Sequence, residues 1–331
     1  MLLQVPIIDV GPFRLGGTVG RHEVADQVGR AIADIGFLVI TGHGVDPALI
    51  ASVQQVSRTF FDLPLAEKMR VGRPAIDVAR GYIPIEAESI GRSRNVETPG
   101  DLNESLMIGP VDVAADRYFS APEAGRHFAP NLWPAEPSEL RGRYVAYYRA
   151  MGSLAAELMA MFALALDLPD DFFAARIDRH ISRLRVRNYP APLVPPKPGQ
   201  LRAGAHCDYG SLTILRAEDK PGGLQVYNRV EQWVDVPIAP DSFIVNIGEL
   251  MARWTNDRWR ATLHRVVNPP VEQAADSRRQ SLVFFHNPNY DSVVACLPSC
   301  LAPGEEPRYP GITSGGHLRA QFTRTQVESA A

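Results

Sequence analysis

The sequence predicts a mostly β protein with flanking α-helices, whose core is a double-stranded β-helix, or jelly roll. Two observations indicate this fold class. From Ser182 onward the chain consists of short β-type runs, about eight in number, separated by glycine and proline. Such a series suits two packed antiparallel sheets whose open end can hold a ligand. Before Ser182, apolar residues recur instead at helical spacing.

Three helices are expected before the strands. Residues 20–35 carry valine and isoleucine at helical spacing, and Gly36 can end this helix. Asp46 and Pro47 are typical of the N-cap and first position of a second helix. The longest helix should begin near Ser138. It would pack on the sheet through an apolar stripe formed by Leu140, Tyr144, Tyr147, Met151, Leu154, Leu158 and Phe162.

The pattern of elements divides the chain into four parts within one compact unit. Residues 1–137 form an N-terminal region of helices and strand, and its proline-rich stretch 73–137 is expected to supply loops over a substrate. Residues 138–181 contain the long supporting helix and a connection. The jelly-roll core spans residues 182–300, and a C-terminal segment covers 301–331. The strands of the core are expected at residues 184–189, 211–217, 224–227, 232–236, 242–247, 262–267 and 280–286, with a weaker one at 293–297.

Composition restricts the class of protein. A hydrophobic share of 45% and a charged share of 21% indicate a globular core and argue against disorder. The net charge of −3 gives no basic excess for nucleic acid. The most apolar stretch, residues 154–168, is too short to cross a membrane and contains Glu157 and Asp167. An odd number of cysteines and no recognisable signal peptide favour reduced thiols and a cytoplasmic location. The oligomeric state is left open.

His206, Asp208 and His264 form a candidate set of metal ligands. His206 and Asp208 are two residues apart, so on a strand their side chains would share one face, while Cys207 would point away. His264 lies in a later β-type run. Two imidazoles and one carboxylate on one side of a cation leave its other positions open. This arrangement suits a non-haem Fe(II) ion that admits both a co-substrate and oxygen.

Arg279 and Ser281 form a candidate carboxylate site. They share one face of the strand expected at residues 280–286. A guanidinium group can donate two parallel hydrogen bonds to a carboxylate, and a hydroxyl can add a third. Because a buried arginine without an anionic partner is costly, this site indicates a bound oxo-acid close to the metal.

The chain resembles a known family, the 2-oxoglutarate/Fe(II)-dependent dioxygenases of the isopenicillin N synthase-like type. Besides the three candidate ligands, the motifs that carry the resemblance are VPIID at residues 5–9, DIGFLVITGHGV at 34–45, FFDLP at 60–64, RGY at 80–82, RNYP at 187–190, GGLQV at 222–226, NIGEL at 246–250, WTN at 254–256 and Arg279-x-Ser281.

The resemblance implies specific roles for these residues. His206, Asp208 and His264 would bind Fe(II), and Arg279 with Ser281 would bind the distal carboxylate of 2-oxoglutarate, with Tyr189 as a further contact. Together with O2 the site would oxidise a small-molecule substrate, releasing succinate and CO2; hydroxylation is the expected outcome, and desaturation or cyclisation lies within the family's reach. Many plant relatives have asparagine at the position of Arg187, which leaves the auxiliary co-substrate contacts open.

Three alternatives stay open. A related non-haem iron oxidase could use the same ligands without 2-oxoglutarate. A zinc hydrolase could use a His-Asp-His set, but the carboxylate site and the lack of a general-base motif argue against it. A non-catalytic metal- or ligand-binding barrel is the third. For the primary substrate, loops and strand ends at a barrel mouth carry specificity. The expected contacts are Tyr82, Ile83, Asn103, Met107, Gln225 and Tyr227.

Overall fold

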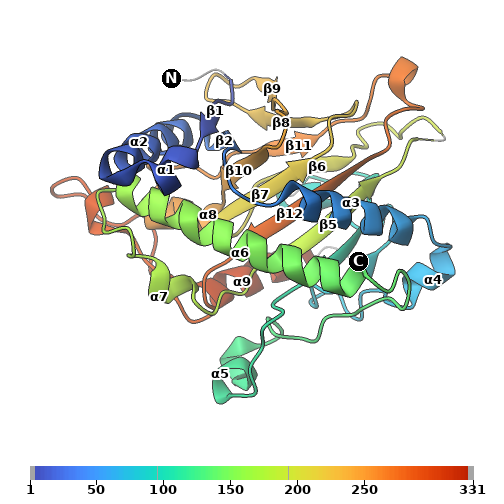
Figure 1. Ribbon diagram of the computed structural model, residues 1–331, viewed down its shortest axis with the longest axis horizontal. Helices are drawn as coiled ribbons and strands as arrows, with labels where there is room; N and C mark the ends of the chain where they lie inside the picture. Colours follow the sequence, from blue (N-terminus) through green and yellow to red (C-terminus); the bar gives the residue numbers. More distant parts are fainter. Residues whose placement is uncertain (1–3, 95, 193, 327–331) are drawn as a thin grey trace.

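Two β-sheets and a layer of helices make up most of the computed structural model, which describes residues 4–94, 96–192 and 194–326 (Figure 1). In chain order the strands are β1 (Ile7–Asp9), β2 (Phe37–Thr41), β3 (Gly81–Ile83), β4 (Glu104–Ile108), β5 (Arg183–Tyr189), β6 (Ala203–His206), β7 (Leu212–Ala217), β8 (Leu224–Tyr227), β9 (Trp233–Asp235), β10 (Phe243–Ile247), β11 (His264–Val266), β12 (Arg279–His286), β13 (Val293–Val294) and β14 (Ile312–Thr313).

The larger sheet has eight strands in the order β1-β2-β10-β7-β12-β5-β4-β3. The smaller sheet has four, in the order β6-β11-β8-β9, and β13 pairs with β14. The two main sheets pack against each other through apolar residues of both, including Ala217 and Ile244 from the larger sheet and Val226 and Val266 from the smaller one. This arrangement is consistent with a jelly-roll core.

Helices cover the other face of the larger sheet. In chain order the helices of the described residues are α1 (Gly11–Leu15), α2 (Gly17–Ile35), α3 (Pro47–Phe61), α4 (Leu65–Met69), α5 (Arg117–Ser120), α6 (Leu140–Ala165), α7 (Ala174–Ile177), α8 (Glu249–Trp254) and α9 (Ser314–Gln326), with 3-10 turns at Ile90–Arg94, Pro122–Ala124, Val271–Gln273 and Pro298–Cys300. The larger sheet is covered mainly by α2, α3 and α6. Figure 1 shows α6 running across the sheet, and both α2 and α3 contact it. Leu184, Leu282 and Phe284 pack against these helices in one large apolar core.

The three predicted helices are confirmed as α2, α3 and α6. Gly36 ends α2 in a left-handed conformation (φ 73°), and its N–H donates to the carbonyl of Ile32. The carboxylate of Asp46 accepts a hydrogen bond from the N–H of Ala48 and so caps α3. The strands predicted from residue 184 onward correspond to β5 and β7 to β13, several of them shorter than expected.

The structure differs from the prediction in its proportions. The fold is mixed rather than mostly β, because helices contain more of the described residues than strands do. The stretch 73–137 is not wholly irregular: β3 and β4 form one edge of the larger sheet. Both are short, and β4 is stabilised by pairing with β5, a strand distant in the sequence, so no local pattern marks it. Among the described residues, no helix combines the length and the apolar character needed to cross a membrane.

Candidate active site

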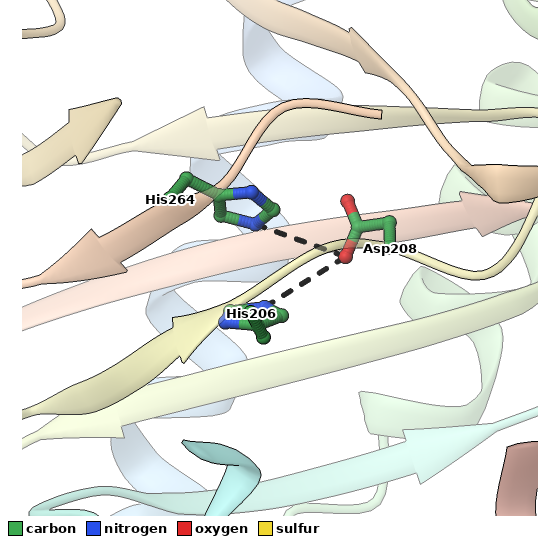
Figure 2. Close-up of side chains that lie close together, drawn as sticks. All are labelled: His206, Asp208 and His264. Carbon is green, nitrogen blue, oxygen red and sulfur yellow. Dashed lines mark ion pairs between the residues drawn. The ribbon is translucent and has the colours of Figure 1, made fainter. Parts of the chain in front are cut away.

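His206, Asp208 and His264 lie together at the ends of two strands of the smaller sheet (Figure 2). His206 ends β6 and His264 begins β11; because these strands are antiparallel, the two histidines are direct cross-strand partners. Asp208 follows in the turn after β6. The Nε2 atom of each histidine is 3.8 Å from Oδ1 of Asp208, and one ligand atom from each residue lies within 4.8 Å of the others. All three side chains are buried.

Backbone carbonyls orient both imidazoles. The Nδ1 atom of His206 is 2.8 Å from the carbonyl oxygen of Gly204, and Nδ1 of His264 is 3.0 Å from that of Thr262. A carbonyl oxygen can only accept, so each Nδ1 carries the proton and each Nε2 keeps its lone pair for a metal. Burial lowers the pKa of His206 to about 3, which favours the neutral form that a metal requires.

The carboxylate of Asp208 is also held in place. Its Oδ2 accepts hydrogen bonds from Oγ1 of Thr213 (2.6 Å) and from Nδ2 of Asn246 (2.7 Å), so Oδ1 is left toward the histidines. Burial alone would raise the pKa of Asp208, but attraction to His264 and His206 when these are protonated, and the hydrogen bonds from Asn246 and Thr213, lower it below its ordinary value. The group is therefore an anion ready to bind a cation.

A small cavity of about 50 Å³ lies beside the three ligands, between the two sheets. It is lined by Arg187, Tyr189, Ala203, His206, Asp208, Thr213, Leu215, Leu224, Asn246, His264, Val266, Arg279, Ser281, Val283 and Phe285. The predicted metal ligands and the predicted carboxylate site therefore face the same space.

Arg279, Ser281 and Tyr189 lie side by side in that cavity. Arg279 and Tyr189 are cross-strand partners on β12 and β5, and the guanidinium carbon lies 5.4 Å from the centre of the Tyr189 ring. The hydroxyl of Ser281 donates to that of Tyr189 at 3.5 Å. Nη1 of Arg279 donates to the carbonyl of Gly222, but its buried Nε has no hydrogen-bond partner among the described residues. Burial lowers the pKa of Arg279, and Tyr189, Glu218 and Asp219 offset this effect only in part. In the described part of the chain no carboxylate lies within 4.0 Å of its guanidinium group.

Sequence reasoning did not assign roles to three residues of this site. Thr213 and Asn246 fix the carboxylate of Asp208. Arg187 lines the cavity, and its register partner on β12 is Ser281. The available signal was a polar residue within a buried apolar strand, as with Asn246 in Phe243–Ile247. Such a residue needs a partner in the fold.

The expected substrate contacts do not line this cavity. Tyr82 lies on the helix face of the larger sheet, where its ring packs against Phe60 and its hydroxyl donates to Glu104. On β8 the cavity is lined by Leu224, so the alternation of side chains directs Gln225 and Tyr227 to the other face.

There the amide of Gln225 bonds Asp235 and Arg265, and the ring of Tyr227 packs near Trp233.

Ile83, Asn103 and Met107 lie closer to the cavity. Register places Ile83 opposite Ser105 and Met107 opposite Arg185, on the same face of the larger sheet as Arg187. The side chain of Asn103 accepts a hydrogen bond from Arg187 at 3.2 Å. The assignment of these three residues to the substrate stays a prediction.

Cys207 lies between two of the candidate ligands but is directed elsewhere. Its thiol donates to the carbonyl of Ala261 and borders a separate cavity near Glu249 and His317. Burial raises its pKa to about 11, so the thiol stays protonated at neutral pH.

Comparison with known proteins identifies the family. Residues 5–136 match the model of the N-terminal region of the non-haem dioxygenases of morphine synthesis, and residues 181–288 match that of the 2OG-Fe(II) oxygenase superfamily. A 2-oxoglutarate-Fe(II) type oxidoreductase of Emericella nidulans is 33% identical, over 98% of this chain and 91% of its own. The chain is a 2-oxoglutarate/Fe(II)-dependent oxygenase.

Two further relatives extend this finding. The validamycin A dioxygenase of Streptomyces hygroscopicus subsp. limoneus is 31% identical over 91% of this chain and 81% of its own. The crystal structure of a full-length Neurospora crassa protein in complex with alpha-KG (2-oxoglutarate) and thymine superposes with a TM-score of 0.83, at 31% identity and 97% coverage of each chain. The oxygenase therefore oxidises a small molecule with Fe(II), 2-oxoglutarate and O2.

Proposed function

We propose that His206, Asp208 and His264 bind the Fe(II) of this oxygenase. The donor set fits the ion: two neutral imidazoles and one carboxylate, each oriented by a second hydrogen bond, converge from one side. The side of the ion away from these donors is then free for other ligands. When bound by these three residues, Fe(II) would supply the oxygen activation that is coupled to conversion of 2-oxoglutarate to succinate and CO2.

Arg279, Ser281 and Tyr189 bind the distal carboxylate of 2-oxoglutarate in this proposal. The observation that carries it is the buried Arg279, 2% exposed, which faces the same cavity as the three candidate ligands. Within the described part of the chain its Nε has no hydrogen-bond partner. A carboxylate placed there would receive charge-assisted hydrogen bonds from Arg279 and a hydrogen bond from a hydroxyl. The clamp orients the co-substrate and keeps its opposite, oxo-acid end directed at the metal.

The substrate is proposed to be a small-molecule metabolite that is hydroxylated. Two of the relatives support this. One is named for a small molecule, validamycin A, and the Neurospora crassa protein was crystallised with another, thymine. We further propose that the strands of residues 182–300 form a double-stranded β-helix, supported by the helix region 138–181. Loops of residues 73–137 cover the substrate, and residues 301–331 form a C-terminal segment of the same compact unit. The enzyme is proposed to act in the cytoplasm without nucleic-acid or membrane partners.

Substrate-stimulated succinate formation tests the proposal. The Fe(II)-loaded enzyme would be incubated with 2-oxoglutarate, O2 and a library of small molecules, and succinate and CO2 would be quantified. One compound should raise both, in equal amounts, above the background of uncoupled turnover. An oxidase that does not use 2-oxoglutarate would consume O2 without forming succinate. A zinc hydrolase or a non-catalytic barrel would do neither.

A further inference from the structure

Arg187 is a buried charge that the proposed metal and co-substrate sites do not use. It lies in the middle of β5, is 5% exposed, and lines the cavity beside the metal ligands. Its one hydrogen bond with the described residues runs from Nη1 to Oδ1 of Asn103, at 3.2 Å. No carboxylate of the described residues lies within ion-pair distance of its guanidinium group. An amide oxygen is a weak partner for a guanidinium ion.

The nearby carboxylates are already engaged. Glu88 bridges Arg73 and Arg185, with 2.6 Å between its Oε2 and Nη2 of Arg185. These two arginines outweigh the effect of burial and lower the pKa of Glu88 to about 2. Asp101 accepts hydrogen bonds from the backbone N–H groups of Ile90 (3.1 Å) and Gly204 (3.0 Å).

The charges near Arg187 leave it without a carboxylate of its own. Arg73, Arg185 and Arg187 share two carboxylates, those of Glu88 and Asp101. The buried Arg202 also has no carboxylate within 4.0 Å in the described part of the chain, but its guanidinium group donates to three backbone carbonyls, whereas that of Arg187 donates to one amide oxygen. An uncompensated buried charge is costly, so a further anion is favoured next to Arg187.

The co-substrate is not that anion. In the proposed function one carboxylate of 2-oxoglutarate lies on Arg279 and Ser281, and the other lies at the metal. The two cavity arginines also reach in different directions: Arg279 donates to Gly222, which precedes β8 of the smaller sheet, whereas Arg187 donates to Asn103, which precedes β4 at the far edge of the larger sheet.

We propose that Arg187, positioned by Asn103, binds a carboxylate of the primary substrate, so that the enzyme acts on small monocarboxylic acids. This inference rests on the proposed function. The free N–H groups of a guanidinium form a planar fork that matches a carboxylate. Because the guanidinium group of Arg187 is charged, it would give this enzyme a preference for an acid over the corresponding amide.

Acetate and acetamide are suitable probes, because they have nearly the same shape and differ in charge. Each would be titrated, at constant ionic strength, into the anaerobic Fe(II)–2-oxoglutarate enzyme. Binding would be followed by the paramagnetic relaxation that the nearby iron causes in the methyl protons of the probe. Acetate should show saturable relaxation and acetamide should not. Equal behaviour of the two probes would overturn the proposal.

Three variants locate the charge. Arg187→Gln should weaken acetate binding by about thirtyfold or more, while Arg187→Lys should retain much of it. Asn103→Asp supplies an internal carboxylate of nearly the same size and should also displace acetate. A merely structural role of Asn103 or Arg187 would not give this pattern. Acetate affinity that is unchanged in Arg187→Gln or in Asn103→Asp would contradict it.

The 2-oxoglutarate affinity of each variant separates this inference from the proposed function. This affinity would be measured by titrating 2-oxoglutarate and following the charge-transfer band of the Fe(II) complex. It should stay within about threefold of the affinity of the unmodified enzyme. A loss in Arg187→Gln as large as that in Arg279→Leu would assign Arg187 to the co-substrate instead. Absence of the band in the unmodified enzyme would refute the proposed function itself.

Discussion

The two faces of the larger sheet are equally buried but differ in chemistry. On strands β5 and β12, Leu184 and Phe284 face the helices, whereas Arg187 and Arg279 face the cavity. All four side chains are 5% exposed or less. The apolar side chains stabilise the fold, because each removes apolar surface from water. The arginines on the other face oppose it unless they find partners.

This difference shows which face of the sheet has all its packing partners within the fold. The helix face is filled by α6 and its neighbours. On the cavity face, counting only contacts with residues that the structure describes, the buried Nε of Arg279 has no hydrogen-bond partner and Arg187 donates to one amide oxygen. Changes on the helix face should therefore reduce stability, and changes on the cavity face should reduce ligand binding. The following experiments test that separation.

Loss of a metal ligand should have the largest effect. His206→Ala, Asp208→Ala or His264→Ala should abolish turnover at limiting iron, because a site with two ligands binds Fe(II) weakly. Succinate formation and iron content would be measured together. Cys207→Ala is the matched control, since its thiol points to another cavity and should be dispensable. Full activity of any ligand variant would remove that residue from the metal site.

Truncation on the helix face should act on stability alone. Phe284→Ala removes a side chain that is fully buried among α6 and the sheet, and should lower the free energy of unfolding by about 3–5 kcal/mol. Urea unfolding provides the measurement. Below the transition, the variant should bind 2-oxoglutarate as the unmodified enzyme does. Weakened binding with unchanged stability would contradict the assigned difference between the faces.

Replacement of Arg279 should weaken ligand binding without reducing stability. Arg279→Leu removes the charge that faces the distal carboxylate and should weaken 2-oxoglutarate binding by about 2–5 kcal/mol. The charge-transfer band of the anaerobic Fe(II) complex reports the affinity. Iron binding should survive, because Arg279 is not a ligand. Stability should not fall, since the change removes a buried charge with no carboxylate partner. Unchanged affinity would refute the clamp.

Local sequence patterns predicted the parts of the fold that depend on neighbouring residues. The caps at Gly36 and Asp46 and the stripe on α6 are such features. The edge strands β3 and β4 were missed, because their pairing partners are far away in the chain. The sequence also contains no signal for short helices such as α5 and α7, because four residues are too few to show an apolar repeat. These unpredicted helices are part of the reason that the fold contains more helix than expected.

The site shows the same division. Spacing and resemblance predicted a common site for six residues, and all six line one cavity: His206, Asp208, His264, Arg279, Ser281 and Tyr189. They could not place Thr213 and Asn246 on the carboxylate of Asp208, because those contacts depend on the register between β7 and β10. Tyr82 was expected near the substrate, yet the alternation along β3 places it on the helix face beside Phe60.

Histidines next to the helix face should make stability depend on pH. Burial lowers the pKa of His180, beside Tyr148 and Phe284, to about 4. As the pH falls from 6.5 to 4 the unfolded chain binds a proton that the native state does not, so stability is lost on acidification. The loss should reach about 3 kcal/mol.

His180→Gln removes this group and should flatten the dependence of the unfolding free energy on pH over that range. An equal slope in His180→Gln and the unmodified enzyme would show that His180 does not contribute to acid sensitivity.

Ser281→Ala should give the smallest of these effects and the finest test of the cavity face. The hydroxyl of Ser281 donates to that of Tyr189 and is expected to turn to the carboxylate when 2-oxoglutarate binds. Removing one neutral donor should weaken 2-oxoglutarate binding by about 1 kcal/mol. The same titration as for Arg279→Leu measures it. Because Arg279 supplies the charge, the two variants should differ clearly. A loss in Ser281→Ala as large as that in Arg279→Leu would mean that the serine positions the arginine and does not simply add a hydrogen bond.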